Sequence, residues 1–291
     1  ATIDDVAKHL GVSWGFVRQI QEHYLRQSVG QTDLAALRRL AIDELAIGKG
    51  HSYVTVVLDL DSGAAVYVGE GKGADAVTPF LHRLREAGTQ LEAVACDMGR
   101  AYHLAVRLVF PQVRIVLDHF HVVKLMNEKL SELRRSLYNQ EHHVLRKNVL
   151  KGTRWLLLKL PEHLDPDKGE PQRLAEALAL NEPLAIGYYL KEDLSQFWHQ
   201  DDADQAARFL DDWIARAEAT RLWPMRGMAT TLRRHRQELL NYYHVRISTG
   251  PLEGFNNKAQ TMKRQAYGYR NREFYKLKLM TLHLKKYALV G

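Results

Sequence analysis

Apolar and polar residues alternate with a period of two over much of the stretch from residue 39 to residue 118, which is the pattern of half-buried β-strands. Two segments inside this stretch, 74–87 and 101–110, instead repeat their apolar residues with helical spacing. The strands are expected at 40–43, 51–60, 64–69, 91–96 and 113–117. This order predicts an α/β fold, in which a mixed sheet starts as an antiparallel meander and ends in βαβ units.

Helical spacing characterises the rest of the chain. A short helical segment covers 1–27, a long all-helical region covers about 119–245, and a basic helical tail covers 249–291. A break rich in Pro and Asp, from Pro161 to Pro171, interrupts the long helical region. The pattern therefore predicts a sheet with a helical segment before it and a large helical insertion after its last strand.

The N-terminal segment fits a helix-turn-helix motif. Ala7 supplies the small residue where two helices cross, and Gly11 supplies a turn residue that tolerates positive φ. Ser13 is a natural N-cap for the second helix, and Val17 and Ile20 are expected to lock that helix against the first. The residues expected to face outward, toward a DNA major groove, are Trp14, Arg18 and Gln19. The alternative is a helical hairpin that makes no contact with DNA.

Composition narrows the class of protein. With 46% hydrophobic and 26% charged residues, the chain has the balance of an ordinary globular protein rather than a disordered one. Apolar runs such as Val54 to Leu58 are too short to cross a bilayer, and the polar start predicts no signal peptide. The single cysteine, Cys96, excludes a disulfide framework and a cysteine-cluster zinc site within this chain. We therefore expect a cytoplasmic protein without a membrane partner.

Charge is distributed unevenly along the chain. The formal net charge of +7 combines an acidic segment, −9 over 161–220, with two strongly basic ones, +6 over 124–160 and +8 over 256–291. The last segment also carries aromatic residues, and this combination favours a polyanion such as DNA as partner. The alternative is a set of Lys and Arg side chains that only keep the surface solvated.

Two aspartates end predicted strands. Asp43 follows the first strand and Asp97 the fourth, so both carboxylates emerge at one edge of the sheet if these strands are neighbours. Two carboxylates held together repel unless a cation neutralises them, and a hard divalent ion is the natural partner. Glu253 is the candidate third ligand, on a helix expected to have Gly250 as N-cap and Pro251 as first residue. Three such carboxylates suit two metal ions about 4 Å apart, the arrangement for in-line phosphoryl transfer.

The helix that contains Glu253 continues with a polar and basic surface. Such a surface is poorly suited to a hydrophobic core and suits contacts with DNA phosphates. Its candidate DNA-binding residues are Asn256, Asn257, Lys258, Lys263 and Arg264. The alternative is that these side chains only solvate an exposed helix.

Five short motifs occur in order at distant positions. They are Asp43-Glu44 after Ala41-Ile42, Lys49-Gly50-His51, Val94 to Asp97-Met98, Asp118-His119-Phe120-His121 continuing to Lys124, and Gly250-Pro251-Leu252-Glu253 continuing to Lys258. Together they resemble the bacterial insertion-sequence transposases of the ISL3 type, and the resemblance covers nearly the whole chain. It implies an RNase H-like core with a DDE metal triad, whose matching positions are Asp43, Asp97 and Glu253.

The resemblance also implies a function. Such a transposase would use two Mg²⁺ or Mn²⁺ ions to cut DNA at the terminal inverted repeats of a mobile element, and would join the freed 3′-hydroxyl to target DNA. Because transposition must bring two ends together, we expect a homodimer or larger synaptic assembly, associated with the nucleoid. Two other hypotheses stay open: an RNase H-like DNA nuclease or resolvase without strand transfer, and a non-catalytic helix-turn-helix DNA-binding protein.

Some residues near the implied triad allow two interpretations. Period-two alternation lets only one of Asp43 and Glu44 face the site, and the family motif favours Asp43. Asp118 and His121 match an Asp-x-x-His element of several such transposases, with His121 a candidate contact to the scissile phosphate or a flanking base. The alternative is a helix N-cap followed by a half-buried histidine.

The resemblance extends to the domain organisation. We expect four parts: a helix-turn-helix at 1–27, the first part of the RNase H-like core at 28–138, a helical insertion domain at 139–245, and the second part of the core, with the Glu253 helix and the basic tail, at 246–291. The interval of 156 positions between Asp97 and Glu253 has room for that insertion, which argues against a minimal nuclease. The family usually has a Cys-rich zinc module before the helix-turn-helix, so we expect that an upstream segment is missing from this chain.

Overall fold

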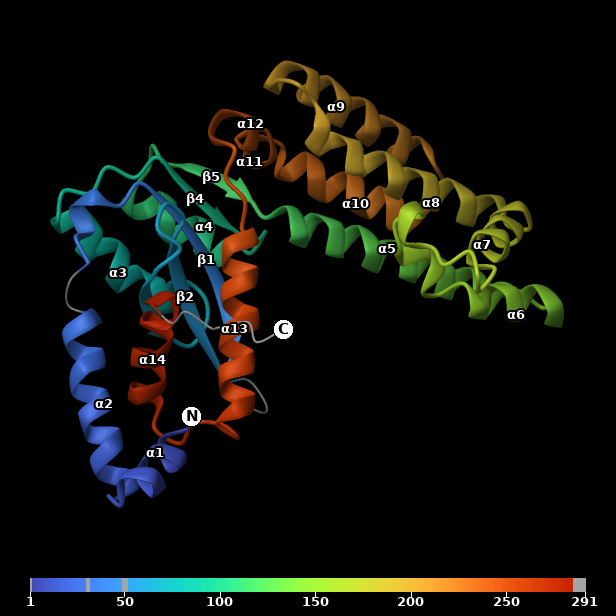
Figure 1. Cartoon of the computed structure of the whole chain (residues 1–291). Helices are drawn as coiled ribbons and strands as arrows, with labels where there is room; N and C mark the ends of the chain where they lie inside the picture. The colour runs from blue at the N-terminus through green and yellow to red at the C-terminus, as the bar shows by residue number, and fades with distance from the viewer. Residues whose placement is uncertain (1, 30–31, 49–51, 285–291) are drawn as a thin grey trace. The chain divides into compact units, whose positions relative to one another are not determined.

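The computed structural model describes residues 2–29, 32–48 and 52–284 of the chain. The Lys49-Gly50-His51 motif lies outside these residues. Contacts divide the chain into a sheet unit, Ala1–Asp118 and Ile247–Gly291, and a helical unit, His119–Arg246. Figure 1 labels the elements of both units.

Five strands form one mixed sheet in the order β3-β2-β1-β4-β5. Figure 1 labels β2, β1, β4 and β5 of this sheet. They are β1 (Arg39–Ala46), β2 (Tyr53–Asp59), β3 (Ala65–Glu70), β4 (Ala93–Cys96) and β5 (Arg114–Leu117). β1, β2 and β3 pair in antiparallel fashion, whereas β4 pairs in parallel with both β1 and β5. The predicted mixed sheet is therefore confirmed, and β1 is its central strand.

One face of the sheet packs against two helices. These are α3 (Ala74–Glu86) and α4 (Arg100–Val109), which follow β3 and β4 along the chain. The alternate strand residues Leu40, Ile42, Val94 and Cys96 belong to the core on this side, together with Phe80 of α3. The even-numbered positions of β1 and β4 thus supply the main hydrophobic core of the sheet unit.

Two helices from the C-terminal part of the chain complete the sheet unit. α13 (Gly250–Gln265) contacts β1, and α14 (Arg272–Met280) contacts β3 and α2. The buried side chains of α13 follow helical spacing and are Leu252, Phe255, Ala259 and Met262. In Figure 1, α13 runs along the sheet from the level of β4 and β5 toward the far end of β1.

The N-terminal helices only partly follow the predicted motif. In α1 (Ile3–Leu10) and α2 (Trp14–Val29), Ala7 is buried at the helix contact, and the Ser13 hydroxyl accepts a hydrogen bond from the Phe16 amide at 3.2 Å. Gly11 ends α1 with a φ of 64°, the left-handed conformation that favours glycine. One residue that was expected to pack α2 against α1 does not do so, because Ile20 is 44% exposed. α2 has 16 residues and packs against α14 as well as α1.

The helical unit contains eight α-helices among its residues, all of which the structure describes. They are α5 (His119–Gln140), α6 (Val144–Gly152), α7 (Glu170–Ala179), α8 (Glu182–Ser195), α9 (Ala203–Ala219), α10 (Trp223–Arg234), α11 (Arg236–Leu240) and α12 (Tyr242–Val245). α5 packs against α8 and α10, and α9 packs against α10. Trp213 of α9 is fully buried, and its indole N–H donates to the Leu190 carbonyl at 2.9 Å.

Three element boundaries differ from the sequence-based expectation. β1 continues to Ala46, because its second half stays paired with β2, so Asp43 lies inside the strand rather than at its end. α13 starts one residue early, with Thr249 rather than Gly250 as N-cap. The expected limit between residues 138 and 139 falls within the continuous helix α5, whereas the sheet unit ends at Asp118. Within the described ranges no helix is long and apolar enough to span a membrane.

The central strand gives a test of the fold. Leu40 of β1 is fully buried, so Leu40→Ala should lower the free energy of unfolding by about 2–5 kcal/mol through lost burial and a new cavity. Leu104 of α4 is 59% exposed, and Leu104→Ala is the matched control, with an expected change within about 0.5 kcal/mol. Urea denaturation followed by circular dichroism measures both. Equal losses in the two variants would contradict this packing of β1.

Candidate active site

Three aspartates lie in a row across neighbouring parallel strands. The positions paired with one another in β1, β4 and β5 include Ala41, Ala95 and Val116. Two residues further along each strand direction stand Asp43, Asp97 and Asp118. Asp97 and Asp118 directly follow the last residues of β4 and β5, so the strand register brings the three aspartates to neighbouring positions at one edge of the sheet. The sequence prediction had paired only the first two.

Strand alternation separates Asp43 from Glu44. Asn256 of α13 donates from Nδ2 to Asp43 Oδ2 at 2.8 Å, so Asp43 lies on the side of α13. Glu44 lies on the opposite side, where the Tyr102 hydroxyl is 3.4 Å from Glu44 Oε1. Burial raises the pKa of Tyr102 to about 12, and the negative charges of Glu44 and Asp97 add to this effect. The Tyr102 hydroxyl therefore stays protonated as a donor to Glu44 at neutral pH.

The second aspartate is held by the start of α4. Asp97 Oδ1 accepts a hydrogen bond from the Gly99 amide at 2.9 Å, and the Asp97 main-chain carbonyl lies 2.8 Å from His103 Nε2. A Cβ atom at position 99 would stand only 2.8 Å from Asp97 Oδ1, so a side chain there would push the carboxylate away. Glycine at this position keeps the Asp97 carboxylate against the helix start.

The third aspartate is bonded to the N-cap of α13. The Thr249 hydroxyl donates to Asp118 Oδ1, and both residues are buried, with 4% and 8% exposure. This hydrogen bond joins residues 131 positions apart in the sequence. A buried carboxylate with a hydroxyl donor is far more stable than one left without it. The contact therefore fixes the first turn of α13 beside the end of β5.

Glu253 shares a stripe of α13 with the residues that contact the strands. Thr249, Asn256 and Gln260 are separated from Glu253 by four, three and seven positions, which places them on one side of the helix. Thr249 bonds to Asp118 and Asn256 to Asp43, while Gln260 Nε2 donates to the Ala46 carbonyl at 3.0 Å. Glu253 lies between the first two contacts and is exposed. The helix thus carries this carboxylate along the same edge of the sheet as the aspartate row.

The donor groups at this edge fit a hard divalent cation. Carboxylate and amide oxygens are the ligands that Mg²⁺ and Mn²⁺ prefer. Asn256 Oδ1 is buried and has no hydrogen-bond partner, although the same amide donates to Asp43. An unpartnered buried oxygen is uncommon, and a cation beside Asp43 would satisfy it. Among the described residues no three His, Cys, Asp or Glu side chains lie close enough to hold an ion, so Asp43, Asp97 and Glu253 are not gathered into a metal cluster.

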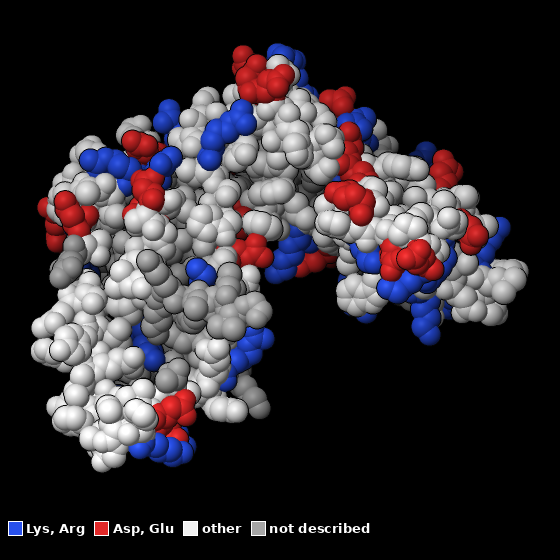
Figure 2. Space-filling view, in the orientation of Figure 1, with Lys and Arg blue, Asp and Glu red and all other residues white. Residues whose placement is uncertain are grey.

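The predicted DNA-binding residues of α13 lie on its outer surface. Asn257, Lys258 and Arg264 are exposed, and Lys263 is half-buried with its Nζ 3.4 Å from the Ala46 carbonyl. Figure 2 shows Lys and Arg side chains gathered over the lower half of α13 in that view. Asn256 differs from this group, because its amide bonds to Asp43 rather than facing solvent.

The residues of α2 that were predicted to face DNA are not all directed outward. Trp14 and Gln19 are exposed, as expected. Arg18 is half-buried: its guanidinium lies over the Phe274 ring at 5.4 Å, and it pairs with Glu22 at 3.1 Å. The expectation that Arg18 faces outward is therefore wrong in this structure, because α14 packs against that side of α2. His121 lies in the first turn of α5, in the helical unit, and is half-buried.

Sequence reasoning missed the two groups that hold the carboxylates. No local signal marks the role of Thr249, because its hydroxyl donates to the distant Asp118 rather than capping a backbone amide of α13. Asn256 was assigned to DNA alone. Its place three positions after Glu253 was the available signal, because residues three apart on a helix share a face.

Comparisons with known proteins find that this chain is similar to transposases. A family model described as a transposase, of the DDE class and ISL3 type, matches residues 40–279. A transposase for insertion sequence element IS1001 of Bordetella parapertussis is 32% identical over 282 residues, covering 96% of this chain and 69% of that protein. A transposase for insertion sequence element IS1557 of Mycobacterium tuberculosis is 28% identical over 290 residues, covering 91% of this chain and 65% of that protein.

The chain thus spans about two thirds of the length of these curated relatives. Among solved structures, the Drosophila P element transposase strand transfer complex has a TM-score of 0.44 and 12% identity to this chain. That match covers 89% of this chain and 79% of the other.

The bond between Thr249 and Asp118 gives a test of the site's framework. Thr249→Val removes the donor but keeps the shape of the side chain, so a buried carboxylate loses a partner. We expect the free energy of unfolding to fall by about 1–3 kcal/mol. Thr249→Ser keeps the hydroxyl and should stay close to the parent protein. Urea denaturation compares the two, and a valine variant as stable as the serine variant would contradict the role of this bond.

Proposed function

The chain belongs to the ISL3-type family of DDE transposases, and we propose that it cuts DNA at the ends of a mobile element and joins the freed 3′-hydroxyl to target DNA. The observation that carries this proposal is the row of aspartates on three neighbouring strands, with the Glu253 helix bonded across it. The central position of β1 in a mixed sheet supports the RNase H-like core that the family resemblance implies. Asp43 and Asp97 stand at neighbouring positions of that core.

Asp43, Asp97 and Glu253 are the residues proposed to hold two Mg²⁺ or Mn²⁺ ions. When bound, such ions supply Lewis-acid stabilisation of the phosphate and activate the attacking water or 3′-hydroxyl. The protein's own groups orient the carboxylates: Asn256 holds Asp43, and the Gly99 amide holds Asp97. Asp118 is proposed to act through Thr249, as a positioning residue for the helix that bears Glu253.

We propose different roles for the sheet unit and the helical unit. We assign catalysis to the sheet unit and treat the helical unit, which the chain enters after Asp118 and leaves before Ile247, as an insertion into it. DNA recognition is assigned to α1 and α2 as a helix-turn-helix, with Trp14 and Gln19 the exposed candidates for base contacts. Two copies of the protein would hold the two ends of the element together, since each end needs its own cut.

A direct assay tests the proposed reaction. The protein is incubated with labelled duplexes that carry the inverted repeats flanking its own gene, with plasmid target DNA, and with Mg²⁺ or Mn²⁺. Labelled end joined to plasmid supports transposition. Cleaved end without joined product would replace it by a nuclease or resolvase, and DNA that is bound but uncut would replace it by a non-catalytic DNA-binding protein.

Substitutions of the three proposed metal-binding carboxylates test the assignment most directly. Asp43→Asn, Asp97→Asn and Glu253→Gln should each reduce cleavage and joining by at least about a thousandfold, because each removes a charge that the metal ions need. Binding of the labelled end should change little. Glu44→Gln, next to Asp43 but on the opposite face of β1, is the control and should keep activity. Activity lost in Glu44→Gln and kept in Asp43→Asn would reverse the assignment.

The basic surface of α13 is proposed to contact phosphates. Replacing Lys258 and Lys263 together by alanine should weaken binding equally for end DNA and random DNA, and should lower the slope of log affinity against log salt by roughly two. Fluorescence anisotropy at several salt concentrations measures the slope. Lys168→Ala is the control, because Lys168 lies in the helical unit and already pairs with Asp165 at 2.6 Å. An unchanged slope would indicate that these lysines only solvate the exposed surface of α13 and do not contact phosphates.

A further inference from the structure

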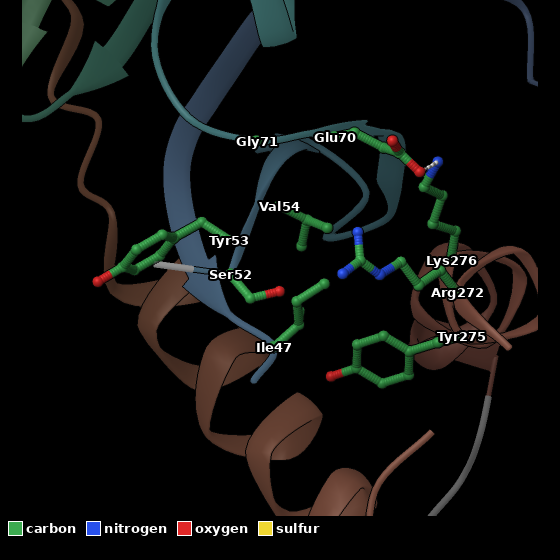
Figure 3. Close-up of a pocket in the computed structure, with 9 residues that line it drawn as sticks. All are labelled: Ile47, Ser52, Tyr53, Val54, Glu70, Gly71, Arg272, Tyr275 and Lys276. Carbon is green, nitrogen blue, oxygen red and sulfur yellow. Dashed lines mark hydrogen bonds and ion pairs between the residues drawn. The ribbon is translucent and has the colours of Figure 1, made fainter. Parts of the chain in front are cut away.

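A cavity of about 400 Å³ opens at the end of the sheet where β1 and β2 meet, beside the start of α14. Figure 3 shows the side chains of Ile47, Ser52, Val54, Arg272 and Tyr275 directed toward one space, whereas the Tyr53 ring points away from it. The cavity lies wholly within the sheet unit. Its walls combine aliphatic side chains with hydroxyl groups and a guanidinium.

The Tyr275 hydroxyl is the most unusual group in this cavity. Tyr275 is 3% exposed, and its hydroxyl is buried without a hydrogen-bond partner. Burial raises the pKa of Tyr275 to about 12, so the hydroxyl keeps its proton and is available as a donor. A buried donor without an acceptor destabilises the free protein, and an acceptor bound in the cavity would relieve that cost.

The charge of the cavity is also unbalanced. Lys276 is already paired, with Glu70 at 3.0 Å and Glu273 at 2.8 Å. Arg272 forms no ion pair within the described part of the chain, although its charge acts on Glu70, and its guanidinium extends into the cavity (Figure 3). An unpaired guanidinium next to hydroxyl donors is the arrangement that binds phosphate oxygens.

A second cavity continues the first. It measures about 270 Å³, shares Ser52, Arg272 and Tyr275 with the first, and adds Lys263 and Arg270 to the lining. Lys263 also belongs to the basic surface of α13. Two joined cavities with positive charge along both suit a chain of phosphates better than one small molecule.

The position of the cavity relates it to the aspartate row. Ile47 follows Asp43 by four residues along β1, which corresponds to about 13 Å in an extended strand. That distance equals about two to four nucleotide steps, because 3.4 Å is the rise of a stacked duplex along its axis and an unstacked strand spans more length per nucleotide. A strand whose phosphate lies at the aspartates would therefore reach the cavity a few nucleotides away.

We propose that this cavity binds one nucleotide of the DNA strand that passes over the aspartate row. Its phosphate accepts hydrogen bonds from Arg272, Ser52 and Tyr275, and its sugar and base lie against Ile47 and Val54. The inference rests on the proposed function, because it takes its ligand to be the DNA on which the protein acts. The cavity adds a DNA contact away from the carboxylates. This contact prevents the DNA strand from sliding along its own direction.

Two variants separate this role from a structural one. Arg272→Ala should weaken binding of the labelled end duplex about tenfold, and Tyr275→Phe about threefold, in EDTA by fluorescence anisotropy. Because the Tyr275 hydroxyl has no partner in the free protein, Tyr275→Phe should leave the urea midpoint unchanged or raise it. Arg83→Ala, which removes an exposed arginine of α3, is the control and should bind as the parent does.

Neutral phosphate substitution locates the contact. End duplexes are prepared with a single methylphosphonate at each position in turn. For the parent protein, one position about two to four nucleotides from the cleavage site should weaken binding about tenfold. Arg272→Ala should be insensitive to substitution at that same position and keep its response elsewhere.

The outcomes distinguish this inference from the proposed function. If the parent protein cuts and joins DNA but Arg272→Ala and Tyr275→Phe bind like the parent, the cavity is not a DNA contact. If free deoxynucleotide or inorganic phosphate binds as tightly as the duplex and the variants abolish that binding, the cavity is a small-molecule site and the inference is wrong. A parent protein that neither binds nor cuts end DNA would overturn both proposals.

Discussion

Parallel pairing of β1 with β4, and of β4 with β5, in one register is the constraint on which the candidate site depends. It converts three aspartates that are 54 and 21 positions apart in the sequence into neighbours at one level of the sheet. Each aspartate has a hydrogen-bond donor that holds it in place: Asn256 for Asp43, the Gly99 amide for Asp97 and Thr249 for Asp118.

Helix α13 adds a fourth carboxylate, that of Glu253, to the three aspartates. Its two anchors, Thr249 and Asn256, are seven residues apart, or about 10 Å along a helix axis. A helix held at two such points has little freedom to rotate, so the exposed Glu253 between them is held in place by the backbone rather than by its own contacts. An exposed side chain on a rigid support suits the metal-ligand role that we propose for Glu253.

Much of the sheet could be predicted, because period-two alternation and strand-ending aspartates depend on local sequence. Long-range contacts could not. Ser13 was predicted as a cap from its neighbours alone, whereas Arg18 was wrongly directed outward because the side chain that covers it, Phe274, comes from the far end of the chain. Asp118 was left with two interpretations because its partner, Thr249, lies 131 positions away. The expected adjacency of the Asp43 and Asp97 strands is confirmed, but Asp43 lies inside β1 rather than at its end, since nothing local marks how far β1 stays paired with β2.

The bond from Thr249 to Asp118 also has a consequence for the chain between these two residues. It brings together the two points where the chain leaves and re-enters the sheet unit, so the ends of everything inserted between them are side by side. When the ends of an insertion already meet, its length matters little: each doubling adds only about 0.6 kcal/mol of closure entropy. The Thr249–Asp118 bond therefore keeps the two connections to the helical unit together, whatever the length of chain between them, and leaves the start of the Glu253 helix beside the end of β5.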